Sequence, residues 1–146
     1  MPPDKDDLFE HFHAIMHLFK DRMRHALDSE GGGLGPTEAR ALGYFARHPG
    51  CTQQDLVQQS GRDKAQITRI VQQLMERGLL AREADPADRR RFNLQLTDKG
   101  LQIEQAMQAQ RKALLASMLG ALDHTEQAQL ISLLQRMRRG AEQNKL

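Results

Sequence analysis

The sequence, 146 residues long, has few of the features that mark secreted, membrane or disulfide-stapled proteins. It contains one cysteine, Cys51, so it cannot form an internal disulfide, and this usage fits a reducing cytoplasm. No apolar run approaches the roughly 18 to 20 residues that a membrane span needs. The N-terminal stretch MPPDKDDLFEHF is acidic, where a signal peptide would be basic and then apolar. We therefore expect a cytoplasmic protein with no membrane partner.

Catalytic motifs are also missing. The sequence has no glycine-rich phosphate loop before a helix, no nucleophile motif and no metal-ligand cluster with a base. The glycines at 31–33 follow a helical pattern and lack the lysine and serine of a phosphate-binding loop. We therefore expect no enzyme activity, no catalytic residue, no cofactor and no bound metal.

Positive charge is concentrated in the middle of the chain, although the formal net charge is only +2. Residues 1–30 hold four Lys and Arg against seven Asp and Glu, whereas residues 62–91 hold eight against five. A local basic face indicates an anionic partner at one surface. An ordinary solvated charged face would give the same composition, so composition alone leaves both interpretations open.

Apolar spacing predicts a series of helices. Apolar residues recur on one side from Leu8 to Leu27, and glycine and proline end this helix at 29–36. Thr37 is expected to cap a second helix, which ends near residues 48–50.

Two further helices follow. Thr52 with Asp55 predicts a capping box at the start of a short third helix. Asp63 is expected to cap a fourth helix that ends at Gly78.

The rest of the chain predicts a hairpin and then more helix. Leu79–Glu83 and Phe92–Thr97 have the pattern of two short strands joined by a turn at Asp85-Pro86. A long helical pattern follows Thr97, breaks near Asp123 and resumes to form a last helix. Short helix, turn, longer helix and hairpin together form a winged helix-turn-helix, in which the longer helix can lie in the major groove of DNA.

The fourth predicted helix has two contrasting sides. Its apolar stripe consists of Ile67, Ile70, Val71 and Leu74. The opposite side carries Arg62, Ala65, Gln66, Arg69, Gln72 and Gln73. Glutamine pairs with adenine, arginine with guanine, and alanine can touch a thymine methyl group, so this side can read base edges. Gln66 is ambiguous, because it can instead complete the cap on Asp63.

Three consecutive arginines, Arg89, Arg90 and Arg91, lie between the turn and the second strand in DPADRRRFNLQLTDKG, residues 85–100. At the tip of a hairpin beside the fourth helix, one arginine can enter the minor groove while its neighbours meet phosphates. Asp88 can orient one of them before DNA arrives. The alternative is a loop whose arginines pair with acids such as Asp85 and Asp88.

The order of elements and the hairpin motif resemble the MarR (multiple antibiotic resistance regulator) family of bacterial transcription factors. The family pattern D-x-R, alternating apolar residues and L-T-x-x-G is matched here by Asp88, Arg90, Leu94, Leu96, Thr97 and Gly100. LMERGLLARE, residues 74–83, resembles the family's passage from helix to wing. The resemblance covers nearly the whole chain.

The resemblance implies a mainly α fold with a small two-stranded β-wing. It implies one subunit over 1–146, a winged helix-turn-helix over 37–100, and dimerisation helices at 1–30 and 101–146. Arg90 matches the wing arginine that enters the minor groove, and Gln66, Thr68 and Arg69 match recognition-helix positions that commonly contact DNA. The expected DNA-binding residues are Arg62, Lys64, Ala65, Gln66, Thr68, Arg69 and Gln72 on the helix and Asp88, Arg89, Arg90 and Arg91 on the wing.

The resemblance also implies a function: a homodimer that binds double-stranded DNA at an inverted-repeat operator, most often as a repressor. Many family members release DNA when a small, often aromatic or phenolic molecule binds. Four residues are candidates for such a pocket, or alternatively for the core: Met16, Phe19, Met23 and Phe45. A winged helix used only for protein interaction is the main rival hypothesis.

Other family members respond to oxidation or to metal. Cys51 begins the third predicted helix, where a helix N-terminus can lower a thiol pKa, but the family's peroxide-sensing cysteine sits in the N-terminal helix. His13 and His17 have a spacing suited to two metal ligands, yet no further acid or histidine completes an obvious site. An incidental thiol and histidines that flank an apolar face are the plainer interpretations.

Overall fold

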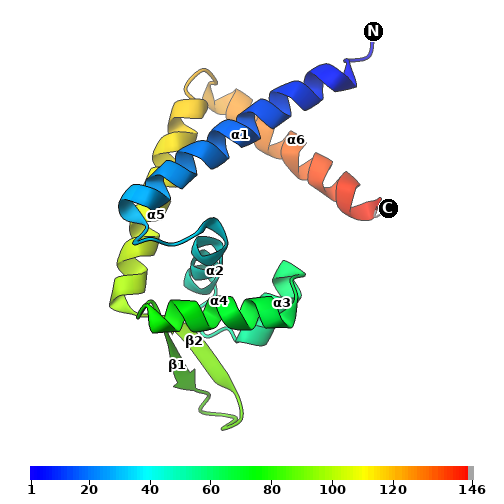
Figure 1. Ribbon diagram of the computed structural model, residues 1–146. Helices are drawn as coiled ribbons and strands as arrows, with labels where there is room; N and C mark the ends of the chain where they lie inside the picture. Colours follow the sequence, from blue (N-terminus) through cyan, green and yellow to red (C-terminus); the bar gives the residue numbers. More distant parts are fainter. Residues whose placement is uncertain (145–146) are drawn as a thin grey trace. The chain divides into compact units, whose positions relative to one another are not determined.

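The computed structural model describes residues 1–144, which form six helices and one two-stranded antiparallel sheet (Figure 1). The mainly α fold with a small β-wing was predicted from the sequence. The chain divides into two compact units, Met1–Arg111 and Lys112–Leu146. The predicted winged helix-turn-helix region, 37–100, lies wholly within the first unit.

The first two helices begin at different kinds of cap. Helix α1, Lys5–Glu30, starts after Asp4, whose side chain accepts a hydrogen bond from the backbone N–H of Asp6. Helix α2, Pro36–Arg47, starts after Gly35. The prediction that Thr37 caps this helix is wrong. Proline suits the first helical turn because its fixed φ fits the helix and its missing N–H would have no partner there, so the helix begins before Thr37.

Helices α3, Gln53–Ser60, and α4, Lys64–Glu76, start as predicted. The capping box is complete: the N–H of Asp55 donates to the Thr52 hydroxyl, and the N–H of Thr52 donates to the Asp55 carboxylate. The Asp63 side chain accepts from the N–H of Ala65. Gly61 ends α3 in the left-handed region, with φ of 66°, where a side chain would be strained.

The predicted hairpin is confirmed, with a shift of one residue at three of the four strand ends. Strand β1, Leu80–Ala84, pairs with β2, Phe92–Leu96, so that Leu80 faces Leu96 and Ala84 faces Phe92. Figure 1 shows this hairpin, which we call the wing, projecting beside α4.

The L-T-x-x-G motif joins the wing to the next helix. Thr97 donates its hydroxyl to the carbonyl of Gly78 and accepts from the N–H of Gly100. A Cβ atom at position 100 would collide with the carbonyl oxygen of Leu79. Glycine is therefore required there, because the backbone of the helix start packs directly on the strand entry.

The core of the first unit lies between α2, α3, α4 and the base of the wing. The predicted apolar stripe of α4 is buried in it. Its largest fully buried side chains are Phe45, Leu42, Ile67, Leu74, Leu79 and Val71. Burying this stripe fixes which side of α4 faces outward.

The two remaining helices are α5, Asp98–Met118, which begins in the first unit and ends in the second, and α6, His124–Gln143. Helix α6 starts at a complete capping box between Asp123 and Glu126. It has no buried residue along its described length. Among the helices of residues 1–144, none is both long and apolar enough to cross a bilayer.

Candidate nucleic-acid interface

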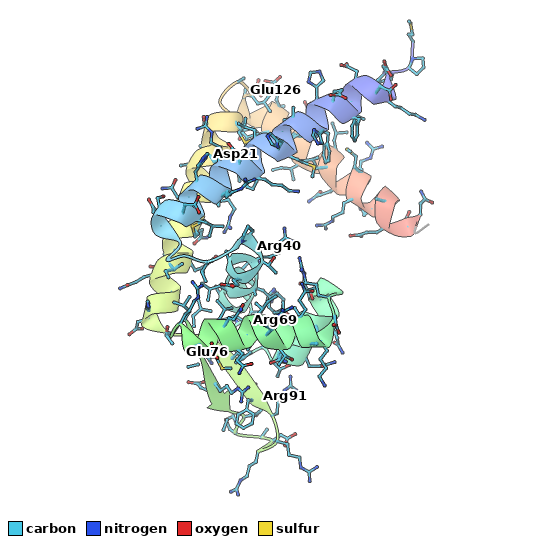
Figure 2. The ribbon with its side chains drawn as sticks, viewed as in Figure 1. Asp21, Arg40, Arg69, Glu76, Arg91 and Glu126 are labelled. Carbon is cyan, nitrogen blue, oxygen red and sulfur yellow. The ribbon has the colours of Figure 1, made fainter. Side chains whose placement is uncertain are left out.

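The outer face of α4 is uncharged or cationic. It consists of Ala65, Thr68, Arg69, Gln72 and Gln73, all exposed. No acidic residue occurs between Lys64 and Met75, although a merely solvated helix surface is usually rich in glutamate. Figure 2 labels Arg69 on this helix. The outer face can therefore approach a polyanion without carboxylate repulsion and present amide and guanidinium donors to it.

Thr68 is held by two hydrogen bonds. Its hydroxyl donates to the carbonyl of Lys64 at 2.9 Å and accepts from Nε2 of Gln53 at 2.6 Å. Gln53 is the first residue of α3 and was not among the residues expected from the sequence. Its contact joins positions fifteen apart in the chain, so only the packing of α3 against α4 reveals it.

Two of the expected helix residues lie away from the outer face. Gln66 is half-buried. The hydrogen bond that caps the helix at the Asp63 side chain is donated by the N–H of Ala65 and not by Gln66. Arg62 is also half-buried and lines a groove of about 340 Å³ between α2, α3 and the start of α4. The groove is lined by the cationic or polar residues Thr37, Arg40, Tyr44, Arg47, Gln59, Ser60 and Arg62, with Ala41, Leu56, Ile67 and Ile70 as its apolar part. DNA contact by Gln66 and Arg62 stays a prediction.

The tip of the wing is organised by its two aspartates. The N–H of Ala87 donates to the Asp85 carboxylate, and the N–H of Arg90 donates to the Asp88 carboxylate, each at 2.9 Å. Asp88 thus orients the main chain of Arg90, which accounts for the D-x-R spacing of the motif. The side chains of Arg89 and Arg90 are exposed at the tip.

Arg91 differs from its two neighbours, because it contacts acids within the protein. The guanidinium of Arg91, a residue that Figure 2 labels, lies 3.7 Å from the Asp55 carboxylate of α3 and 3.9 Å from that of Asp85. Of the two interpretations of the wing arginines, the one in which they pair with acids of the protein therefore holds for Arg91. The Thr52 backbone N–H, the Thr52 hydroxyl and the Arg91 charge together hold the pKa of Asp55 below its usual value, against the opposing effect of burial.

Cys51 is half-buried where α3 meets the wing. Its carbonyl accepts from the N–H of Leu94 at 2.9 Å. Burial, and then a hydrogen bond with the Cys51 thiol, raise the pKa of Tyr44. These contacts give the residue a structural place between α2 and β2, and a redox role for it stays untested.

The histidines of α1 lie on its exposed surface. The rings of His13 and His17 stack with centroids 6.5 Å apart, and His11 pairs with Asp7 at 3.4 Å. Within residues 1–144 no group of three or more His, Cys, Asp or Glu side chains gathers as a metal site would require.

The four candidate pocket residues do not share one environment. Phe45 is 1% exposed in the core, and Met23 packs against that core. Phe19 is half-buried, whereas Met16 is 40% exposed on α1. Their role in ligand binding stays a prediction, and the core alternative suits Phe45 and Met23.

Comparison with known proteins identifies the family. The model of the MarR family matches residues 32–91. The chain is 32% identical over 130 residues to the transcriptional regulator YkoM of Bacillus subtilis, covering 86% of this chain and 82% of YkoM. It is 36% identical over 111 residues to a regulatory protein for the hcr operon of Thauera aromatica, covering 73% of this chain and 64% of that protein.

The fold agrees with this assignment. The crystal structure of the Staphylococcus aureus MepR–DNA complex superposes with a TM-score of 0.68 at 24% identity, covering 88% of this chain and 96% of that one. Its winged-helix fold is the one that the residues of this chain build around α4 and the wing. The chain belongs to the MarR family of transcriptional regulators.

Proposed function

We propose that this regulator is a homodimeric repressor that binds double-stranded DNA at an inverted-repeat operator. The observation that carries the proposal is the carboxylate-free outer face of α4 beside the exposed Arg89 and Arg90 of the wing. A helix that offers amides and a guanidinium suits the edges of bases in the major groove. Exposed arginines at the tip of the adjacent wing can enter the minor groove and contact phosphates.

Uncovered apolar faces support the homodimer. Helix α1 exposes Leu8, Phe9, Phe12, Ile15, Met16 and Leu18, and α6 exposes Ile131, Leu133, Leu134 and Met137. Apolar residues exposed in series along one helix mark an interaction surface. A second copy covers it by two-fold symmetry and places two copies of α4 on successive turns of the duplex.

A small aromatic or phenolic effector that releases the operator completes the proposal. The groove between α2, α3 and the start of α4 suits the anionic members of that class, because Arg40, Arg47 and Arg62 line it beside apolar Leu56 and Ile67. A ligand bound in this groove would contact the start of α4, the recognition helix, and can thereby oppose DNA binding.

The test is titration of the wild-type protein and two variants against randomised and selected duplexes by fluorescence anisotropy. Arg69→Ala is expected to lose about 1–3 kcal/mol on the selected operator and to relax base choice at one position of each half-site. Arg24→Ala, which removes an exposed arginine of α1, is the control and should bind like wild type. Equal weakening on every sequence would make Arg69 a phosphate contact, and no binding to any duplex would favour the protein-interaction hypothesis.

A further inference from the structure

The side chain of Gln53 reaches from α3 to the outer face of α4. Its Nε2 donates to Thr68 Oγ1 at 2.6 Å, and this hydrogen bond is exposed at the surface. The backbone of Gln53 is held as well, since it follows Thr52, whose capping box with Asp55 is complete. The amide therefore lies on the outer face of α4 although it belongs to another helix.

The hydrogen bonds of Thr68 decide which polar atoms remain available. Thr68 gives its only hydroxyl proton to the carbonyl of Lys64 at 2.9 Å. Thr68 consequently has no proton to donate to a base. Gln53 uses one of its two N–H groups on Thr68 and keeps the other N–H and its Oε1. The remaining donor of this pair therefore belongs to Gln53, whose Oε1 lies beside it as an acceptor.

Gln53 also lies between the two surfaces proposed to bind DNA. Besides contacting α4, it lines a groove between the start of α3 and the wing, together with Arg90 and Arg82. An amide in this position faces the same duplex as Arg69 and Arg90, provided that the proposed function holds.

We propose that Gln53 is a specificity-determining residue that reads one adenine in each half-site, with Thr68 as the residue that positions it. This inference rests on the proposed function. Adenine presents an N7 acceptor and an N6 donor in the major groove, so its recognition requires one donor and one acceptor side by side. The amide of Gln53 retains this combination after its bond to Thr68 is made.

The test is selection of a randomised duplex library by the full-length protein, followed by affinity measurements on the selected site and on single-base changes. Wild type should enrich adenine at one position per half-site. Gln53→Ala should lose this preference, and discrimination against other bases there should fall by roughly 5- to 140-fold. Gln53→Glu should shift the preference to cytosine, because a carboxylate only accepts hydrogen bonds and cytosine N4 donates one.

Two further variants separate positioning from folding. Thr68→Val keeps the shape of Thr68 but removes the acceptor, so it should weaken the adenine preference while Gln53 is unchanged. Gln58→Ala is the matched control, since Gln58 is an exposed glutamine of the same helix that does not line this groove, and it should select the wild-type sequence. Thermal melting without DNA shows whether each variant is folded.

The possible results are distinct. A changed base preference in the Gln53 variants with an unchanged melting temperature supports the inference. If wild type selects an operator and both Gln53 variants select the same one, Gln53 only ties α3 to α4 and the inference is wrong. If wild type enriches no sequence at all, the proposed function fails, and the inference fails with it.

Discussion

Glu104 is a charged residue that no motif of the sequence singles out. It lies on α5 with its side chain only 11% exposed, packed over Gly43 of α2 and 3.8 Å from the guanidinium of Arg111. Burial raises its pKa above the usual 4.5, and the charges of Arg111 and Arg47 oppose that rise. The protonated carboxyl is thus relatively more stable in the folded protein than in the unfolded chain.

Replacing Glu104 by glutamine should change how stability depends on pH. Because the folded pKa is raised, Glu104 contributes most to stability below pH 4.5, and this contribution is lost as pH rises through the folded pKa. The free energy of unfolding of Glu104→Gln minus that of wild type should therefore be larger near pH 8 than near pH 4. Urea unfolding at both pH values measures this. A difference that does not change with pH would mean that the arginines fully neutralise the buried charge.

The helices could be predicted from the sequence because apolar periodicity and caps are local signals. Asp55 and Asp63 lie where their spacing placed them, and Gly100 is explained by close packing on Leu79. The start of α2 was misplaced because a proline at the first helical position competes with a threonine cap. Asp55 as a partner of Arg91 and Gln53 as a partner of Thr68 come from another helix, so no local pattern could reveal these two contacts.

The wing arginines should behave differently when replaced one at a time. Arg89 is exposed at the tip, whereas Arg91 lies beside Asp55 and Asp85. If Arg89 meets one phosphate per subunit, Arg89→Ala makes the slope of log affinity against log salt shallower by about 1.8 for a dimer. Arg91→Ala should leave that slope nearly unchanged and cost the DNA-free protein roughly 0.2–1 kcal/mol of stability, the range for partly exposed ion pairs.

Arg90 is expected to act through groove shape. Its backbone is fixed by Asp88, and its exposed side chain can enter the minor groove, which is narrow and strongly negative at A·T-rich sequence. Arg90→Ala should weaken binding most on operators with A·T-rich flanks and keep the base preference within half-sites. Titrations of wild type and all three wing variants on A·T-flanked and G·C-flanked operators measure both effects. Equal losses on the two flanks would contradict a minor-groove role.

The uncovered apolar faces have a consequence for assembly. A chain of 16.6 kDa with exposed Phe12 and Ile15 on α1 and exposed Leu134 on α6 has apolar surface that a second copy can bury. Light scattering at micromolar concentration should give twice 16.6 kDa. A two-fold dimer also requires that both half-sites of an operator be bound together, so loss of the dimer should weaken operator binding far more than binding to a single half-site.

Charge placed on the apolar face of α1 tests this link between assembly and DNA binding. Phe12→Asp combined with Ile15→Asp should give the monomer mass, because burying two unpaired carboxylates in an interface is strongly unfavourable. Affinity for the two-half-site operator should fall to about that for a single half-site. Glu10→Arg is the control, since a residue two positions from Phe12 faces the opposite side of the helix, and it should stay dimeric. If the double variant is a folded monomer that still binds the inverted repeat as tightly as wild type, dimerisation is not what brings the two copies of α4 to the operator.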